Sequence, residues 1–299
     1  MSDIDRAVSV LRAGGLVAIP TETVYGLAAD ASNASAVRRV FAVKGRPADH
    51  PLIVHVGAPA QLGHWAATIP PAAAVLADAC WPGPLTLLVP RAATVLDVVT
   101  GGRATVGVRV PAHPLTLELL ARFGGGLAAP SANRFGRVSP TTAGHVRSDL
   151  GDDVDFVLDG GSCPVGVEST IVDCTVDPPQ VLRPGGISSE EIESLLKMTL
   201  GAPDGPSRAP GMLESHYAPR CKVVLANSRA EAEARLDRLA GAEILADDEL
   251  AHYAHTLFAS LRDADDRGVG TVIAVLPPAS GLGHAIRDRL IKAAGSTWR

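Results

Sequence analysis

Short apolar runs alternate with helical stripes of apolar residues along most of this chain. Runs bounded by Gly, Pro or Asp predict buried strands. The predicted strands cover residues 16–20, 52–56, 85–89, 106–110, 154–158, 169–174 and 181–183. Segments with apolar residues at helical spacing cover residues 4–13, 34–43, 71–81, 115–123 and 141–150. A capping box formed by Ser188 and Glu191 predicts one more helix, up to Lys197.

The order of these elements is irregular, because some strands follow one another directly while helices separate others. This order favours a mixed sheet in an α/β or α+β domain over a regular parallel barrel. We therefore expect residues 1–198 to form one mixed-sheet domain.

Residues 199–220 are rich in Gly and Pro and predict a linker. Beyond it the alternation resumes. The predicted strands are 222–226, 243–245 and 269–276, and the predicted helices are 229–239, 250–264 and 283–294. Short strands with helices between them predict a small Rossmann-like, three-layer α/β domain over residues 221–299.

The composition is that of a folded protein, with 46% hydrophobic and 20% charged residues among 299. A net charge of −5 gives no overall attraction to nucleic acid or to anionic membranes. The cysteines, Cys80, Cys163, Cys174 and Cys221, lie singly, without zinc or redox spacing. No apolar signal region or membrane-length run is present, so we expect a soluble cytoplasmic protein.

Two short stretches carry the candidate chemistry. Lys44 and Arg46 stand two residues apart, followed by Pro47, and in an extended backbone both side chains would leave on the same side. Two neighbouring cations are typical of a phosphate site. Ser131 and Asn133 offer a hydroxyl and an amide on a Pro-led turn. Together these four residues predict a nucleoside triphosphate site built without a P-loop.

Structural interpretations compete with these predictions. Lys44 and Arg46 could form a solvated helix end, and Asn133 could be a turn former. His55, inside an apolar run, could be a core residue with satisfied hydrogen bonds, and Ser139 could only cap a helix.

The remaining polar candidates are also ambiguous. Arg109 lies in an apolar strand, where its charge would be costly unless paired, so an anionic partner is expected. Thr23 could stabilise a turn, and Glu22 could form a salt bridge within the site rather than act as a base. His216 and Tyr217 could be plain linker residues.

Eight motifs occur in an order that resembles the YrdC-like family. They are PTETVYGL (20–27), KGRP (44–47), PLIVHV (51–56), WPGPLT (81–86), VRVP (108–111), PSAN (130–133), ESTI (168–171) and LRPG (182–185). Short motifs are weak singly and strong in order. The tail, with PGM (210–212), HYAP (216–219) and GLG (281–283), is similar to the long, two-domain members.

This resemblance implies a concave active site and a nucleotidyltransferase reaction. L-threonine, bicarbonate (or CO2) and ATP would give L-threonylcarbamoyl-AMP and pyrophosphate. A separate transferase would then pass the activated group to the tRNA adenosine next to the anticodon. Mg²⁺ would arrive with the ATP phosphates, without a dedicated set of protein ligands, and direct tRNA binding is expected to be weak at most.

Residue roles follow from the matched motifs. The expected L-threonine contacts are Thr23, His55, Arg109 and Ser169. The guanidinium of Arg109 suits the α-carboxylate, because its planar fork binds carboxylates in bidentate fashion. The expected ATP contacts are Lys44, Arg46, His50, Thr105, Ser131, Asn133, Ser139 and Arg183, with Tyr217 closing over the nucleotide. The linker carrying His216 and Tyr217 is expected to lie across the pocket.

Other functions stay open at this point. A carbamoyl-adenylate-forming enzyme of hydrogenase maturation is one, although this chain lacks the Cys-x-x-Cys motifs of those proteins. An RNA-binding or regulatory module is another, disfavoured by the acidic net charge and the 4% aromatic content. An inactive paralogue is disfavoured by the intact cation pair and by Ser131 and Asn133.

Overall fold

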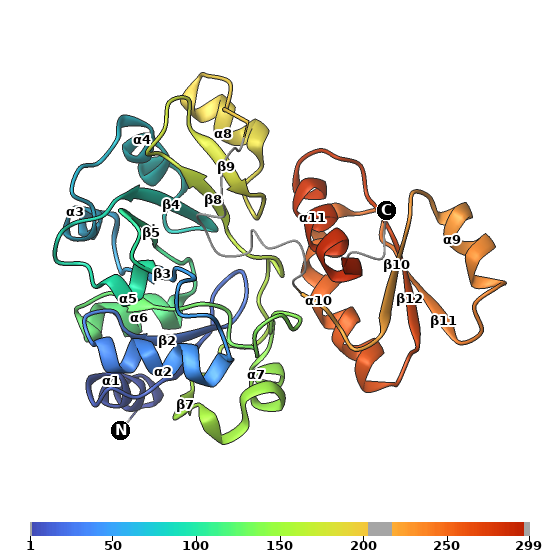
Figure 1. The fold of residues 1–299 in the computed structure, drawn as a ribbon, viewed down its shortest axis with the longest axis horizontal. Helices are drawn as coiled ribbons and strands as arrows, with labels where there is room; N and C mark the ends of the chain where they lie inside the picture. The colour runs from blue at the N-terminus through green and yellow to red at the C-terminus, as the bar shows by residue number, and fades with distance from the viewer. Residues whose placement is uncertain (1, 203–216, 296–299) are drawn as a thin grey trace.

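The computed structural model describes residues 2–202 and 217–295, which form a large and a small unit lying side by side (Figure 1). The large unit contains one mixed sheet, whose strands pair in the order β7-β1-β2-β6-β3-β5-β4-β8-β9. The strands are β1 (Val17–Ile19), β2 (Gly26–Asp30), β3 (Ile53–His55), β4 (Leu85–Pro90), β5 (Thr105–Arg109), β6 (Leu127–Ala128), β7 (Phe156–Val157), β8 (Thr170–Asp173) and β9 (Gln180–Arg183).

Parallel and antiparallel pairs are mixed within this sheet. β1 pairs with β7, β3 with β5 and β4 with β8 in parallel, and the other neighbours are antiparallel. The expectation of a mixed sheet is therefore confirmed. Within the described part of the chain, no helix is long and apolar enough to cross a membrane.

Helices cover the large sheet because its strands alternate their side chains between two faces. They are α1 (Asp3–Arg12), α2 (Ala34–Lys44), η1 (Pro59–Gln61), α3 (Leu62–Trp65), α4 (Pro71–Cys80), α5 (Asp97–Thr100), α6 (Pro114–Phe123), α7 (Ala143–Leu150), η2 (Gly151–Asp153) and α8 (Ser189–Leu196). Val17 and Ile19 pack in one cluster with Leu11 of α1, whereas Ala18 packs in another with Val37 of α2. Alternate side chains of β1 thus pack against helices on opposite faces of the sheet.

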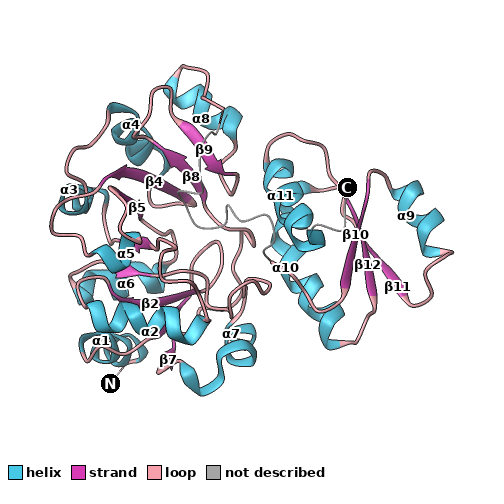
Figure 2. Cartoon of the chain, viewed as in Figure 1, coloured by secondary structure: helices cyan, strands magenta, loops and turns pink. Residues whose placement is uncertain are grey.

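The small unit is a three-layer α/β arrangement, as expected (Figure 2). Its elements are β10 (Lys222–Ala226), α9 (Arg229–Leu236), β11 (Ala242–Leu245), α10 (Leu250–Asp266), β12 (Thr271–Val275) and α11 (Leu282–Ala294). The strands are all parallel, in the order β10-β12-β11. Ala226 and Ile273 pack with Ala232 of α9, whereas Leu225 and Ala274 pack with α10 and α11.

The two units share a core. Helices α10 and α11 face the large unit (Figure 1), and Val24, Val138 and Val167 of the large unit belong to the same apolar cluster as these helices. Arg262 of α10 forms an ion pair of 2.6 Å with Asp149 of α7. The motifs at residues 20–27 and 168–171 therefore border the small unit.

Two local expectations differ from the structure. Strand β2 was not predicted, because its sequence, GLAAD, contains small residues with low strand propensity although it lies inside the sheet. The expectation of an extended backbone at Lys44 and Arg46 is wrong, since α2 continues to Lys44 and Gly45 ends it in the left-handed conformation, with φ 63°. A glycine after the last helical turn is the usual helix C-terminal signal.

Candidate active site

A small buried pocket collects most of the predicted site residues. Its volume is about 50 Å³. Its lining is formed by Thr21, Thr23, Val24, Gly26, Arg46, Ile53, His55, Arg109, Ala129, Pro130, Ser131, Glu168, Ser169, Arg183 and Tyr217. The strand ends of the large sheet place these side chains together, and Tyr217 adds the segment that leads into the small unit.

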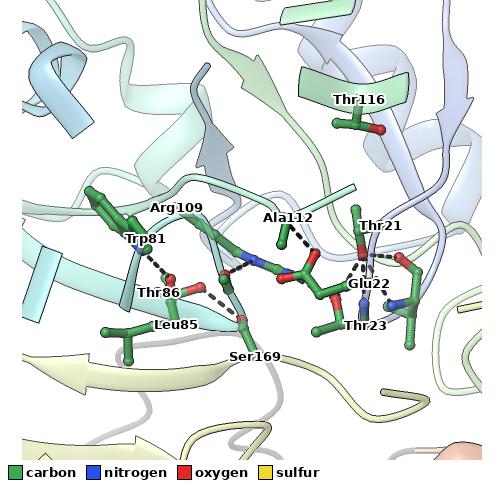
Figure 3. Close-up of polar contacts among 12 residues, drawn as sticks. Thr21, Glu22, Thr23, Trp81, Leu85, Thr86, Arg109, Ala112, Thr116 and Ser169 are labelled. Atoms are coloured by element: carbon green, nitrogen blue, oxygen red, sulfur yellow. Dashed lines mark hydrogen bonds and ion pairs between the residues drawn. The ribbon is translucent and has the colours of Figure 1, made fainter. Parts of the chain in front are cut away.

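Arg109, at the end of β5, forms a hydrogen bond with each of its three nitrogens (Figure 3). Its Nη2 forms a buried ion pair of 2.6 Å with Glu22. Its Nη1 donates to Thr23 Oγ1 at 3.0 Å and its Nε to the Gly83 carbonyl at 3.2 Å. The second Glu22 oxygen accepts the Ala112 N–H at 2.9 Å. The expected anionic partner of Arg109 is therefore Glu22, and the expectation of a salt bridge for Glu22 is confirmed.

This ion pair leaves binding capacity on the guanidinium. Of the five N–H donors of an arginine, the contacts of Arg109 within the described residues use three. One N–H on each terminal nitrogen is left, and two N–H donors are the number that a bidentate carboxylate contact uses.

Thr21 shapes the turn before β2. Its hydroxyl donates to the Val24 carbonyl at 2.6 Å and accepts the N–H groups of Thr23 and Val24, each at 3.2 Å. Thr21, rather than Thr23, is thus the turn-stabilising residue (Figure 3). Its oxygen also lies 2.8 Å from Thr23 Oγ1, so the hydroxyl of Thr23 is held toward Arg109.

Neighbouring turns are fixed in the same way. The Trp81 indole donates to the Leu85 carbonyl at 2.7 Å (Figure 3). Thr116 on α6 donates to the Pro20 carbonyl. These bonds hold the motif turns that present Arg109 and Glu22.

Ser169 and Arg183 line the same pocket and contact each other. Arg183 donates to the Ser169 carbonyl at 2.8 Å and to its hydroxyl at 3.0 Å, and Thr86 Oγ1 lies 2.8 Å from that hydroxyl. Burial lowers the pKa of Arg183. A second guanidinium therefore borders the pocket, on β9.

Arg46 is the third guanidinium of the pocket. Its Nη2 donates to the Pro51 carbonyl at 3.0 Å, and its Cζ lies 5.9 Å from the Phe135 ring centroid. Its Nε is buried and has no hydrogen-bond partner among the described residues. Burial lowers the pKa of Arg46 to about 10, so it stays protonated at neutral pH. A polar ligand would satisfy the orphaned donor.

Lys44 is buried but does not line the pocket. Its ammonium donates to the Ser131 carbonyl at 2.5 Å and to the Asn133 carbonyl. The interpretation of a solvated helix end is wrong, because Lys44 is only 2% exposed. Burial, and next the charge of Arg46, lower the pKa of Lys44 well below its usual value. Lys44 thus fixes the turn that presents Ser131.

Asn133 has both a structural contact and a spare acceptor. Its Nδ2 donates to the carbonyls of Arg134 and Arg137, each at 2.8 Å, so the turn-forming interpretation holds for the amide nitrogen. Its Oδ1 is buried and accepts no hydrogen bond among the described residues.

His55 is a buried, neutral imidazole. Burial, and next the charge of Arg109, lower the pKa of His55 to about 3. Its Nδ1 has no hydrogen-bond partner among the described residues. The interpretation of a satisfied core histidine is therefore wrong, although the residue is 4% exposed.

Glu168 is a pocket residue to which the motif analysis assigned no role. One of its oxygens accepts the Ser139 hydroxyl at 2.5 Å, and the other accepts Arg289 Nε at 2.8 Å. Ser139 does not cap α7, because Thr142 does. The signal in the sequence was an acidic residue beside Ser169 in the ESTI motif. Nothing in the sequence indicated Arg289, which comes from α11 of the small unit.

The other expected residues lie outside the pocket lining. His50 stands behind Arg46, with its ring centroid 5.6 Å from that of Phe135. Thr105 begins β5, at the other end of that strand from Arg109. His216 lies outside the described residues.

Known protein families match both units of the chain. The family model described as "Telomere recombination" matches residues 9–185, and the model described as "Threonylcarbamoyl-AMP synthase, C-terminal domain" matches residues 187–295. The first covers the nine strands of the large unit and the pocket residues other than Tyr217, and the second covers α8, Tyr217 and the small unit.

Relatives match over almost the whole chain. Threonylcarbamoyl-AMP synthase of Pyrococcus abyssi is 40% identical, over 97% of this chain and 93% of that protein. The Bacillus subtilis protein of that name is 39% identical, over 98% and 93%. A crystal structure of P. abyssi Sua5 complexed with L-threonine superposes with a TM-score of 0.92, covering 98% of this chain and 95% of that one. The chain belongs to the threonylcarbamoyl-AMP synthase family, in its long two-domain form.

Proposed function

We propose that this protein joins L-threonine, bicarbonate and ATP into L-threonylcarbamoyl-AMP and pyrophosphate. The observation that supports it best is the charge of the pocket. Arg46, Arg109 and Arg183 meet there, while Glu168 is the only carboxylate among the residues that line it. A buried excess of positive charge suits a ligand set made of a triphosphate and carboxylates.

Arg109 is the proposed anchor of the amino acid. Its two remaining N–H donors take the α-carboxylate of L-threonine, and Thr23, His55 and Ser169 supply further polar contacts in the same pocket. The neutral imidazole of His55 has a ring nitrogen left for a hydrogen bond with the substrate.

Three of the proposed ATP contacts, Arg46, Arg183 and Ser131, line the same pocket. Three more stand outside the lining, where Lys44 bonds to Ser131, Ser139 bonds to Glu168, and Asn133 follows in the Ser131 turn. His50 and Thr105, outside the lining, are the most peripheral of the proposed set. Tyr217 borders the nucleotide.

The chemistry then needs positioning and charge neutralisation rather than a strong protein base. A carboxylate oxygen of N-carboxythreonine attacks the α-phosphorus of ATP, and the bond from that phosphorus to the bridging oxygen breaks. Pyrophosphate leaves with the electron pair. Guanidinium groups stabilise the charge that gathers on the phosphate oxygens, and the pocket holds the two anions together.

Mg²⁺ is proposed as the ion that accompanies ATP. The described residues hold no group of three or more His, Cys, Asp or Glu side chains suited to a metal. The ion would therefore be held mainly by phosphate oxygens, and it would neutralise their charge. The hydroxyl of Ser131 and the unpaired Oδ1 of Asn133 are oxygen donors of the kind that Mg²⁺ prefers.

The proposed domain organisation keeps the sequence boundaries, with a catalytic domain over 1–198, a linker over 199–220 and a small domain over 221–299. The pocket is smaller than the roughly 300 to 1,000 Å³ of typical ligand sites. Binding of a nucleotide beside an amino acid thus requires a wall to move, and we propose the wall that contains Tyr217.

The product would pass to a separate tRNA threonylcarbamoyl transferase, because the mixed anhydride needs an acceptor. Direct tRNA binding that is weak at most, and a cytoplasmic location, stay predictions of the sequence.

Omission of single substrates tests the proposed function. The purified full chain is incubated with ATP, Mg²⁺ and bicarbonate, with and without L-threonine. Pyrophosphate is measured by a coupled assay and the adenylate by mass spectrometry. We expect both products only with L-threonine, and a mass that shifts with ¹³C-bicarbonate. Pyrophosphate release that is independent of L-threonine, or none at all, would overturn the proposal.

A further inference from the structure

Arg289 is a residue of the small unit whose side chain reaches the pocket wall of the large unit. It lies on α11, and the residue is 1% exposed. Its Nε forms an ion pair of 2.8 Å with Glu168, which lines the pocket. Its Nη1 forms a second ion pair of 2.6 Å with Asp288, its neighbour on the same helix. Two nitrogens of the Arg289 guanidinium are thus held by ion pairs.

The same guanidinium also contacts Tyr217. Its Cζ lies 5.2 Å from the centroid of the Tyr217 ring, within the range of a cation–π contact. Tyr217 stacks with Phe258 of α10, at a centroid distance of 5.5 Å. Arg289 therefore contacts two residues of the pocket lining, Glu168 and Tyr217, without lining the pocket itself.

The buried charge of Glu168 depends on its ion pair with Arg289. Burial alone would raise the pKa of Glu168, but Arg289 first and Arg183 next outweigh it and lower the pKa to about 2. The carboxylate therefore stays ionised and keeps accepting the hydroxyl of Ser139. Without Arg289, a buried carboxylate would lose its main counter-charge and would shift or take up a proton.

We propose that Arg289 is a positioning residue of the active site, by which the small unit fixes Glu168 and Tyr217 on the ATP side of the pocket. This inference rests on the proposed function for the placement of ATP. Arg289 contacts Glu168 and Tyr217, and Glu168 in turn accepts the hydroxyl of Ser139, a proposed nucleotide residue. Arg109, the proposed anchor of L-threonine, is held instead by Glu22. The loss of Arg289 should therefore weaken ATP more than L-threonine.

The test compares Arg289→Met with Arg262→Met in the full chain. Arg262 also joins the two units, through Asp149 and the main-chain carbonyls of Val138 and Ser139, but it contacts neither Glu168 nor Tyr217. We expect Arg289→Met to raise KM for ATP on the order of tenfold to a hundredfold, with KM for L-threonine changed less than about threefold. Arg262→Met should leave the ratio of the two KM values unchanged.

A conservative variant covers the case in which Arg289→Met does not fold. Arg289→Lys keeps a charge for Glu168 but loses the planar fork that also reaches Asp288, so it should show a smaller shift in the same direction. Equal changes of both KM values in the folded variant, or unchanged ATP affinity, would overturn the inference. Calorimetric titration with ATP alone separates this result from a failure of the proposed function, since it requires no turnover.

Discussion

Glu22 provides a direct test of the electrostatics of the pocket. Glu22→Ala removes the buried ion pair with Arg109, whose two side chains are 8% and 4% exposed. It also removes the acceptor of the Ala112 N–H. Breaking one side of a buried ion pair costs about 3–5 kcal/mol, because the other charge is left uncompensated. Ala112 is an exposed residue, so water can replace this second hydrogen bond and the ion pair dominates the expected loss.

The matched control is Glu118→Ala on α6. Glu118 forms an ion pair of the same length, 2.6 Å, with Arg122, but both side chains are nearly half exposed. Surface pairs of this kind contribute about 0–1 kcal/mol. Unfolding by urea, followed by circular dichroism, measures both variants against the parent chain. The buried ion pair would not contribute as expected if the two variants lost free energies of unfolding that differ by less than about 1 kcal/mol.

Glu22→Gln separates charge from volume. The carboxamide keeps nearly the same shape and one acceptor oxygen, so the charge and one of the two accepted hydrogen bonds are lost. We expect a cost of about 1.5–3 kcal/mol, the range of hydrogen bonds to charged groups, which is smaller than for Glu22→Ala.

Two further predictions concern His55 and a glycine beside the pocket. Because the pKa of His55 falls from 6.5 to about 3 on folding, the unfolded chain binds the extra proton between these values. Stability should therefore fall as pH drops from 6.5 to 4, by up to about 1.4 kcal/mol per pH unit more than in His55→Gln, and equal slopes would contradict this. Gly185→Ala would place a Cβ 2.3 Å from the Glu168 carbonyl oxygen. The free energy of unfolding measured in urea and the rate of pyrophosphate release should therefore both fall. Gly144→Ala, on α7 with a nearest contact of 3.6 Å, should be neutral or stabilising by about 0.5–1 kcal/mol.

The strands with apolar runs could be predicted because burial and strand propensity agree there. β3 and β5 are examples, each found within a residue or two of its expected ends. β2 could not be predicted, because Gly and Ala side chains leave no hydrophobic run to recognise. Its place in the sheet follows from pairing with β1 and β6, which is a long-range effect.

The site residues also divide into those that the sequence could predict and those that it could not. Residues within motifs, such as Arg46, Arg109 and Ser169, could be predicted to meet, and they line one pocket. The direction of the Lys44 side chain could have been anticipated from the helix-ending Gly45, which turns the chain before Arg46. The pairing of Glu168 with Arg289 could not, because it depends on how α11 packs against the large unit.

We propose that the guanidinium groups of the pocket hold the anions of the reaction. The most direct test compares L-threonine-dependent pyrophosphate release by Arg46→Ala and by Arg38→Ala. Arg38 lies on α2, is exposed and does not line the pocket. The account predicts that Arg46→Ala loses most of this release while Arg38→Ala keeps that of the parent chain. Equal release by the two variants would contradict it.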